Sequence, residues 1–150
     1  MSIYPLYFKW SARMVKALVK PPQHKGEKAR LIVARDGDEV WHTDGQYLKR
    51  GEPHKRLGAL EIENTLRVEQ IRQIIPYHSG DVLHITGDCE ANGTPAVILS
   101  NGALVNRHFL AYLMDGYEVV TLKGNGKLHP VCVLHNGEVI GLAMPMLQVY

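Results

Sequence analysis

Hydrophobic and polar positions alternate along this chain in short runs, and Asn-Gly or Asp-Gly pairs separate the runs. Near the C-terminal end, residues 117–123, 128–135 and 138–144 alternate or run apolar, as strands do. The pairs Asn125-Gly126 and Asn136-Gly137 lie between them and favour the tight turns of β-hairpins. The pattern therefore predicts three antiparallel strands at this end of the chain.

A helix is expected immediately before these strands. Asn106 is a suitable N-cap residue for a helix over residues 107–115. Within that range Phe109, Leu110 and Leu113 fall at helical spacing, so one face of the helix is apolar.

The earlier part of the chain shows the same kinds of signal. The charged segment 51–58 contains Pro53 and is expected to be an internal linker. The predicted fold class is α+β, a largely antiparallel sheet with three helices packed on it. The further elements expected are strands at 4–9, 29–35, 39–43, 46–50, 59–63, 81–86 and 95–100, and helices at 12–20 and from 64 or 65 to 75.

An internal repeat is visible at an offset of 35 residues. Residues 95–102 then fall on residues 130–137, with proline, apolar positions and the Asn-Gly pair aligned. Chance similarity between hairpins is the alternative, because Asn-Gly turns recur for physical reasons. We favour duplication, which predicts that residues 82–105 and 117–140 share backbone geometry.

The C-terminal segment resembles a known family. The segment 105–113, the strand at 117–122, Pro130 and the closing Met144-Pro145-Met146 resemble the last half-domain of the bacterial DNA polymerase sliding clamp. The likeness is specific over residues 103–147 and only architectural elsewhere.

The resemblance implies a clamp-like fold, in which a helix plus a three-stranded meander is duplicated and helices line a positively charged surface facing DNA. It also implies that Met144, Pro145 and Met146 border a groove that holds short peptides of client proteins. The chain departs from the family in having fewer repeated units than a clamp subunit. Residues 147–150 also extend beyond the usual ending.

Charge is unevenly distributed along the chain. Residues 1–56 hold twelve Lys or Arg against six Asp or Glu, and residues 57–150 hold five against nine. We therefore expect one domain over residues 1–150, with a basic N-terminal part up to residue 56 and two repeated units after it. A basic surface attracts phosphate or an acidic partner. The candidate DNA-binding residues, all on predicted helices, are Arg13, Lys16, Lys20, Arg72 and Arg107.

Composition indicates an ordinary soluble protein. The chain has 150 residues, of which 45% are hydrophobic and 21% charged. Two cysteines make no disulfide framework, so a cytoplasmic setting is expected. No signal peptide is recognised at the start, and no apolar run approaches the roughly 18 residues that span a bilayer.

Enzyme motifs and metal-ligand patterns are weak. None of the common nucleotide-binding, nucleophile or zinc-protease motifs occurs. In a strand, His129 and His135 point to one face and Cys132 to the other, so the three do not converge on a metal. We expect neither a cofactor nor a metal.

The sequence therefore predicts a non-enzymatic, clamp-like protein, assembled as a homo-oligomer, that associates with double-stranded DNA or tethers a DNA-processing protein. The alternative is a small protein-binding module or inhibitor from a mobile element that uses the fold without binding DNA.

Overall fold

The computed structural model describes residues 30–75 and 80–146 of the chain. Within these ranges the chain forms three helices, α2 (Lys55–Gly58), α3 (Val68–Ile74) and α4 (Arg107–Met114). The described strands are β1 (Ile32–Asp36), β2 (Glu39–Thr43), β3 (Tyr47–Arg50), β4 (Asp81–Leu83), β5 (Ile85–Ala91), β6 (Thr94–Leu99), β7 (Leu104–Asn106), β8 (Thr121–Gly124), β9 (Val131–His135) and β10 (Glu138–Ala143).

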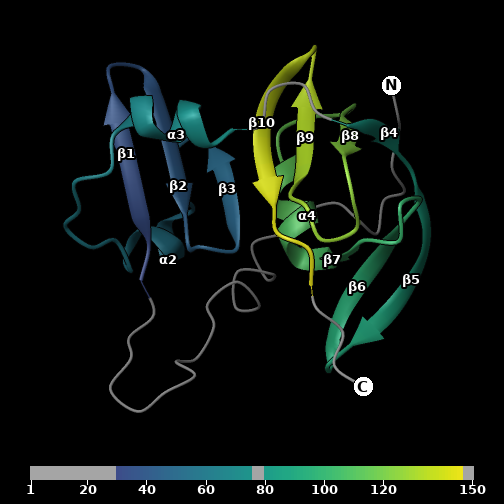
Figure 1. Cartoon of the computed structure of the whole chain (residues 1–150). Coiled ribbons are helices and arrows are strands. Elements are labelled where there is room, and N and C mark those ends of the chain that lie inside the picture. Colours follow the sequence, from purple (N-terminus) through teal and green to yellow (C-terminus); the bar gives the residue numbers. More distant parts are fainter. Residues whose placement is uncertain (1–29, 76–79, 147–150) are drawn as a thin grey trace.

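Seven of these strands form one large sheet in the order β1-β2-β3-β10-β9-β8-β4, and every neighbouring pair is antiparallel. The remaining strands form a small sheet in the order β5-β6-β7. The pairing of β3 with β10 places Leu48 opposite Leu142. It joins two meanders that are far apart in the sequence (Figure 1).

Helix α4 lies where the two sheets meet. It contacts β3 and β10 of the large sheet and β6 and β7 of the small one. Its six consecutive residues from Phe109 to Met114 are all buried. A helix that is apolar and covered all round is an internal helix, not one that faces solvent on one side.

Helix α3 covers the opposite face of the large sheet, over β1 and β2. Its Val68 and Ile71 pack with Trp41, whereas α4 belongs to the other apolar cluster. Because strand side chains alternate between faces, Val33 joins the α4 cluster and Ala34 joins the α3 cluster. The sheet is therefore apolar on both faces.

Several predictions of local structure are confirmed. The meander expected within residues 29–50 forms as β1, β2 and β3. The helix expected over 107–115 forms as α4, and the Asn106 side chain accepts hydrogen bonds from the backbone N–H groups of His108 and Phe109. Residues 51–58, expected to be a linker, contain α2 and the buried Leu57.

The predicted fold class is wrong. The described structure is mostly strand, and it is not a duplicated set of helix-plus-meander units. The first meander does not form a unit of its own, because β3 pairs directly with β10 in the large sheet. Helix α4 cannot line a DNA-facing surface, because its apolar side chains are enclosed between the two sheets.

The repeated segments match only in part. Residues 95–102 and 130–137 both form a strand followed by a turn, and the preceding hairpins share their register at the 35-residue offset. Gly87 pairs with Ile98, and Leu122 pairs with Val133. The two strand triplets nevertheless lie in different sheets.

The match ends at the next hairpin, because the two turns differ. Asn136 and Gly137 both have positive φ, 51° and 81°, which closes a two-residue turn. At Asn101-Gly102 only the glycine has positive φ. Ile98 pairs with Leu104, whereas Val139, the equivalent of Leu104, pairs with Leu134 instead of Val133. A register shift between Val139 and Gly141 then places Gly141 opposite Val133.

Gly141 lets α4 approach the large sheet closely. A Cβ atom at this position would lie 2.8 Å from Leu113 Cδ2 and 3.0 Å from the carbonyl oxygen of Leu48. We expect Gly141→Ala to lower the free energy of unfolding by about 1–3 kcal/mol, as overpacking does. Gly87→Ala is the matched control, because its Cβ would meet only Ile98 Cδ1, at 3.8 Å. Urea unfolding of both variants measures the difference, and equal midpoints would contradict this packing.

Candidate functional site

The predicted DNA-binding residues are not brought together in the described structure. Arg13, Lys16 and Lys20 lie outside the described residues. Arg72 lies on α3 and Arg107 begins α4, and these helices pack on opposite faces of the large sheet. Arg72 and Arg107 therefore do not share one surface.

The Arg72 side chain is paired with a carboxylate of the large sheet. Its Nη2 and Nε atoms donate to the two carboxylate oxygens of Glu39 on β2, at 2.9 and 3.0 Å. Hydrogen bonding to Arg72 lowers the pKa of Glu39. This two-point pairing uses the same guanidinium edge that would bind a phosphate. Arg107, in contrast, takes part in none of the ion pairs found among the described residues.

Two more arginines of the folded body are paired with carboxylates. Arg35 on β1 lies between Glu52 and Glu61, at 2.9 Å from an oxygen of each. Hydrogen bonds from Arg35 lower the pKa of both carboxyl groups. Arg50 lies 3.4 Å from Glu138. The positive charge of these side chains is therefore largely compensated locally.

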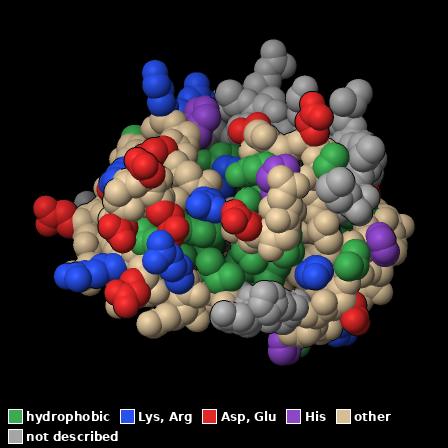
Figure 2. Space-filling model, turned by 90° about the horizontal axis from the view of Figure 1, so that it is seen from above, with side chains coloured by type: hydrophobic (Ala, Val, Ile, Leu, Met, Phe, Trp, Pro, Cys, Tyr) green, Lys and Arg blue, Asp and Glu red, His purple; other side chains and the backbone are tan. Residues whose placement is uncertain are grey.

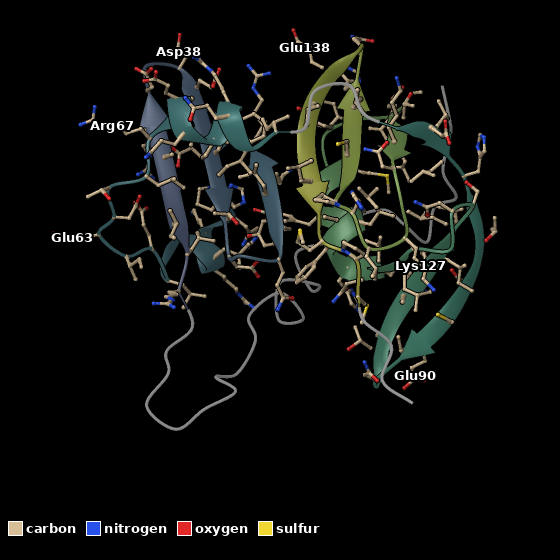
Figure 3. The ribbon with its side chains drawn as sticks, in the orientation of Figure 1. Asp38, Glu63, Arg67, Glu90, Lys127 and Glu138 are labelled. Atoms are coloured by element: carbon tan, nitrogen blue, oxygen red, sulfur yellow. The ribbon has the colours of Figure 1, made fainter. Side chains whose placement is uncertain are left out.

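The outer surface reflects this pairing. On the face shown in Figure 2, hydrophobic side chains gather in the middle, and acidic and basic side chains are mixed around them. Figure 3 shows Asp38 and Glu138 at the same end of the large sheet, with Glu63 and Arg67 beyond its β1 edge. The described residues on the face shown in Figure 2 therefore form no continuous basic surface.

The closing segment Met144-Pro145-Met146 follows β10, which ends at Ala143. The Met144 N–H donates to the carbonyl oxygen of Gln46 at 2.9 Å, and the Met146 N–H donates to that of Leu104 at 2.7 Å. The segment thus runs from the large sheet to the edge of the small one. Met144 is 47% exposed. Peptide binding at this segment stays a prediction.

A buried polar cluster, formed by His42, Tyr47, Lys49 and Tyr112, was not predicted from the sequence. His42 lies on β2, Tyr47 and Lys49 lie on β3, and Tyr112 lies on α4. All four side chains are buried, and the rings of His42, Tyr47 and Tyr112 pack edge to face or tilted against one another. The sequence pattern that could have indicated this cluster is the alternation of side chains in β3, which places Lys49 on the same inward face as Tyr47.

The tautomer of His42 follows from its neighbours. Its Nδ1 lies 2.8 Å from the carbonyl oxygen of Gly51, which can only accept, so Nδ1 carries the hydrogen. Its Nε2 then accepts from the Tyr112 hydroxyl at 2.9 Å, and that hydroxyl accepts from the His54 N–H at 3.0 Å. Burial lowers the pKa of His42 to about 4, so the ring is neutral at pH 7.

Lys49 faces the C-terminal end of α4. Its Nζ atom lies 3.4 Å from the carbonyl oxygens of both Leu113 and Asp115, where the helix leaves its last carbonyls unpaired. The same atom lies 5.2 Å from the ring centroid of Tyr112 and 5.9 Å from that of Tyr117. Burial lowers the pKa of Lys49 to about 8.

These groups have the chemistry of acids and bases, but their contacts are internal. The His42 ring joins β2 to α4, and the Lys49 amine joins β3 to the end of α4. Tyr47 has a buried hydroxyl without a hydrogen-bond partner in the part of the chain that the structure describes. The arrangement fixes α4 on the sheet through directional bonds, in addition to apolar packing.

The histidines and the cysteine considered for a metal site do not converge. Cys132 is buried in the α3 cluster, and the His135 ring contacts the carbonyl oxygen of Val119 and the ring of Tyr117. Across residues 30–75 and 80–146, we find no group of three His, Cys, Asp or Glu side chains that could hold a metal ion. None of the helices in these ranges has the length and apolar character needed to cross a membrane.

Comparison with known proteins gives no relative: no family model, curated protein or solved structure matches this chain.

Acid pH should destabilise the fold through His42. The folded-state pKa of about 4 lies below the ordinary 6.5, so the unfolded chain binds a proton first as the pH falls. We expect the free energy of unfolding to fall by roughly 2 kcal/mol between pH 6.5 and 5. The paired carboxyls Glu39, Glu52 and Glu61 have a pKa below 4.5, so their contribution is lost at lower pH.

Urea unfolding between pH 7.5 and 5 measures this slope. His129→Asn is the control, because that ring lies exposed between β8 and β9 and outside the cluster. The control should keep the slope, and His42→Asn should lose it. A wild-type free energy that stays level from pH 7 to 5 would contradict a neutral, buried His42.

Proposed function

We propose that this chain is a non-enzymatic protein that associates with double-stranded DNA through residues 1–29 and uses its folded body to tether a DNA-processing protein. The observation that carries the proposal is the separation of charge. Residues 1–29 hold six Lys or Arg against one Asp or Glu, a balance of +5, and residues 30–150 hold eleven against fourteen, a balance of −3.

Ion pairing in the body strengthens this separation. Arg35, Arg50 and Arg72 each contact a carboxylate, so they offer little free charge to a polyanion. The net positive charge of the sequence lies in residues 1–29, where Arg13, Lys16 and Lys20 are spaced for one face of a helix. Phosphate contacts by Lys and Arg release counterions and supply the affinity of sequence-independent DNA binding.

The likeness of residues 103–147 to a sliding-clamp sequence is a second reason to expect a partner that works on DNA. This likeness bears on the kind of partner and not on the fold. Three phosphate contacts give only weak binding by one chain, so a homo-oligomer that repeats the basic segment would bind DNA more usefully. Both cysteines of the chain are free thiols, which fits a cytoplasmic setting.

An enzymatic role has less support. The groups with the most perturbed pKa values, His42 and Lys49, contact the helix and the backbone inside the body instead of a surface. The alternative function is a protein-binding module whose basic segment binds an acidic protein, and the same experiment separates the two.

Changing Arg13, Lys16 and Lys20 together to Ala should weaken binding to a long DNA duplex. Each phosphate contact adds about −0.9 to the slope of log affinity against log salt, so the slope should become less steep by up to about 2.7. A fluorescence titration at several salt concentrations measures both quantities for the full chain.

The matched control changes Lys55, Arg56 and Lys127 to Ala. These residues are exposed in the body, and the change in net charge is the same. The control should keep most of the affinity and slope. If wild type shows no salt-sensitive binding, or if both triple variants lose it equally, the basic segment is not a DNA-binding element and the protein-binding alternative takes its place.

A further inference from the structure

The edges of the two sheets are protected to different degrees. An edge strand presents unpaired backbone N–H and C=O groups to any extended chain that approaches it, so proteins usually cover or shorten such strands. At the β1 edge, the Leu31 N–H donates to the carbonyl oxygen of Leu60, and the Ile62 N–H donates to that of Leu31. The Asn64 side chain also donates to the carbonyl oxygen of Val33, at 3.3 Å.

Two other edges are also closed or short. At the β7 edge, the Met146 N–H donates to the carbonyl oxygen of Leu104. The β4 edge consists of only three residues. Strands this short offer too few backbone groups to hold a partner by pairing alone.

β5 differs from these edges. It is seven residues long, and its only paired neighbour among the described strands is β6. The side-chain bond of Thr86, to the carbonyl oxygen of Ile98, also goes to the β6 side. No described residue outside β6 and its turn forms a backbone hydrogen bond with residues 86–91. The outer edge of β5 is therefore the longest strand edge that the described residues leave without backbone hydrogen bonds.

The side chains of β5 favour a partner that carries positive charge. Asp88 and Glu90 are exposed and lie two residues apart, so they project from the same face of the strand. Neither takes part in an ion pair among the described residues, and β5 contains no basic residue. Figure 3 shows Glu90 at the free end of the β5–β6 hairpin.

The same two carboxylates disfavour a second copy of this strand. Antiparallel pairing of two β5 edges would place like charges opposite or diagonal to one another, which is destabilising. A partner strand with Lys or Arg at alternate positions would instead place opposite charges there.

We propose that the β5 edge is a docking site for an extended, basic segment of a partner protein, which adds to the small sheet as a fourth strand. Backbone hydrogen bonds to β5 supply the register, and basic side chains at alternate positions face Asp88 and Glu90. β-branched residues of the partner, placed between its basic residues, lie beside Gly87 and Cys89, where β5 has little side-chain bulk. The residues of this site all lie outside residues 1–29, and the proposal does not depend on DNA binding.

A labelled peptide of about eight residues, alternating Lys and Val, tests the proposal by fluorescence anisotropy with the full chain. The peptide should bind, and backbone amides of residues 86–91 should gain protection from hydrogen exchange. A peptide of the same sequence with an N-methyl group at every backbone nitrogen keeps its charge but cannot donate a backbone hydrogen bond from either edge, so it should not bind. A Glu-Val peptide should not bind either.

Asp88→Asn with Glu90→Gln should weaken binding of the Lys-Val peptide by about twofold to thirtyfold, the range expected for two exposed ion pairs. Asp38→Asn with Glu63→Gln removes the same charge from other exposed sites and should change little. The proposal is overturned if the Lys-Val peptide does not bind, if the N-methyl peptide binds equally well, or if the two double variants behave alike. DNA titration of the Asp88, Glu90 variant should be unchanged, which keeps this test apart from that of residues 1–29.

Discussion

The burial of α4 on all sides is the constraint on which the rest of the structure depends. A helix with six consecutive apolar or aromatic residues cannot expose any side of that run to water without losing the free energy of burial. One sheet covers only one side of a helix, so a second layer is needed. The small sheet supplies that layer, and the large sheet supplies the other through β3 and β10. The glycine at 141 makes the close approach between α4 and β10 possible.

Polar contacts inside the body add direction to this packing. Lys49 and His42 tie the end of α4 to β3 and β2, and their burial carries a cost that directional bonds offset. On the outside, arginines are paired with carboxylates across neighbouring elements, as between Arg35, Glu52 and Glu61. Residues 30–150 carry a net charge of −3, and the net positive charge of the chain, +5, lies before residue 30.

Local structure was predictable from the sequence, and long-range pairing was not. The Asn136-Gly137 turn and the Asn106 cap act over a few residues, so their residue types indicate them directly. The pairing of β3 with β10 carries no such local signal, because any two apolar strands could pair. Helical spacing of Phe109, Leu110 and Leu113 predicts one apolar face, whereas in the structure the whole run from Phe109 to Met114 is buried. The partner of Arg72 depends on where α3 lies on the sheet, which the sequence does not specify.

Native-state hydrogen exchange of the α4 amides tests the central claim most directly, because it reports the free energy of the smallest opening that exposes each amide. If α4 is the internal helix shared by both sheets, the amides of Leu110 to Leu113 exchange only on global unfolding. Protected amides of β6 and β10 then show the same free energy and the same denaturant dependence. Exchange from α4 at a clearly lower free energy than from β10 would show that the large sheet is stable without the helix, and would contradict the account.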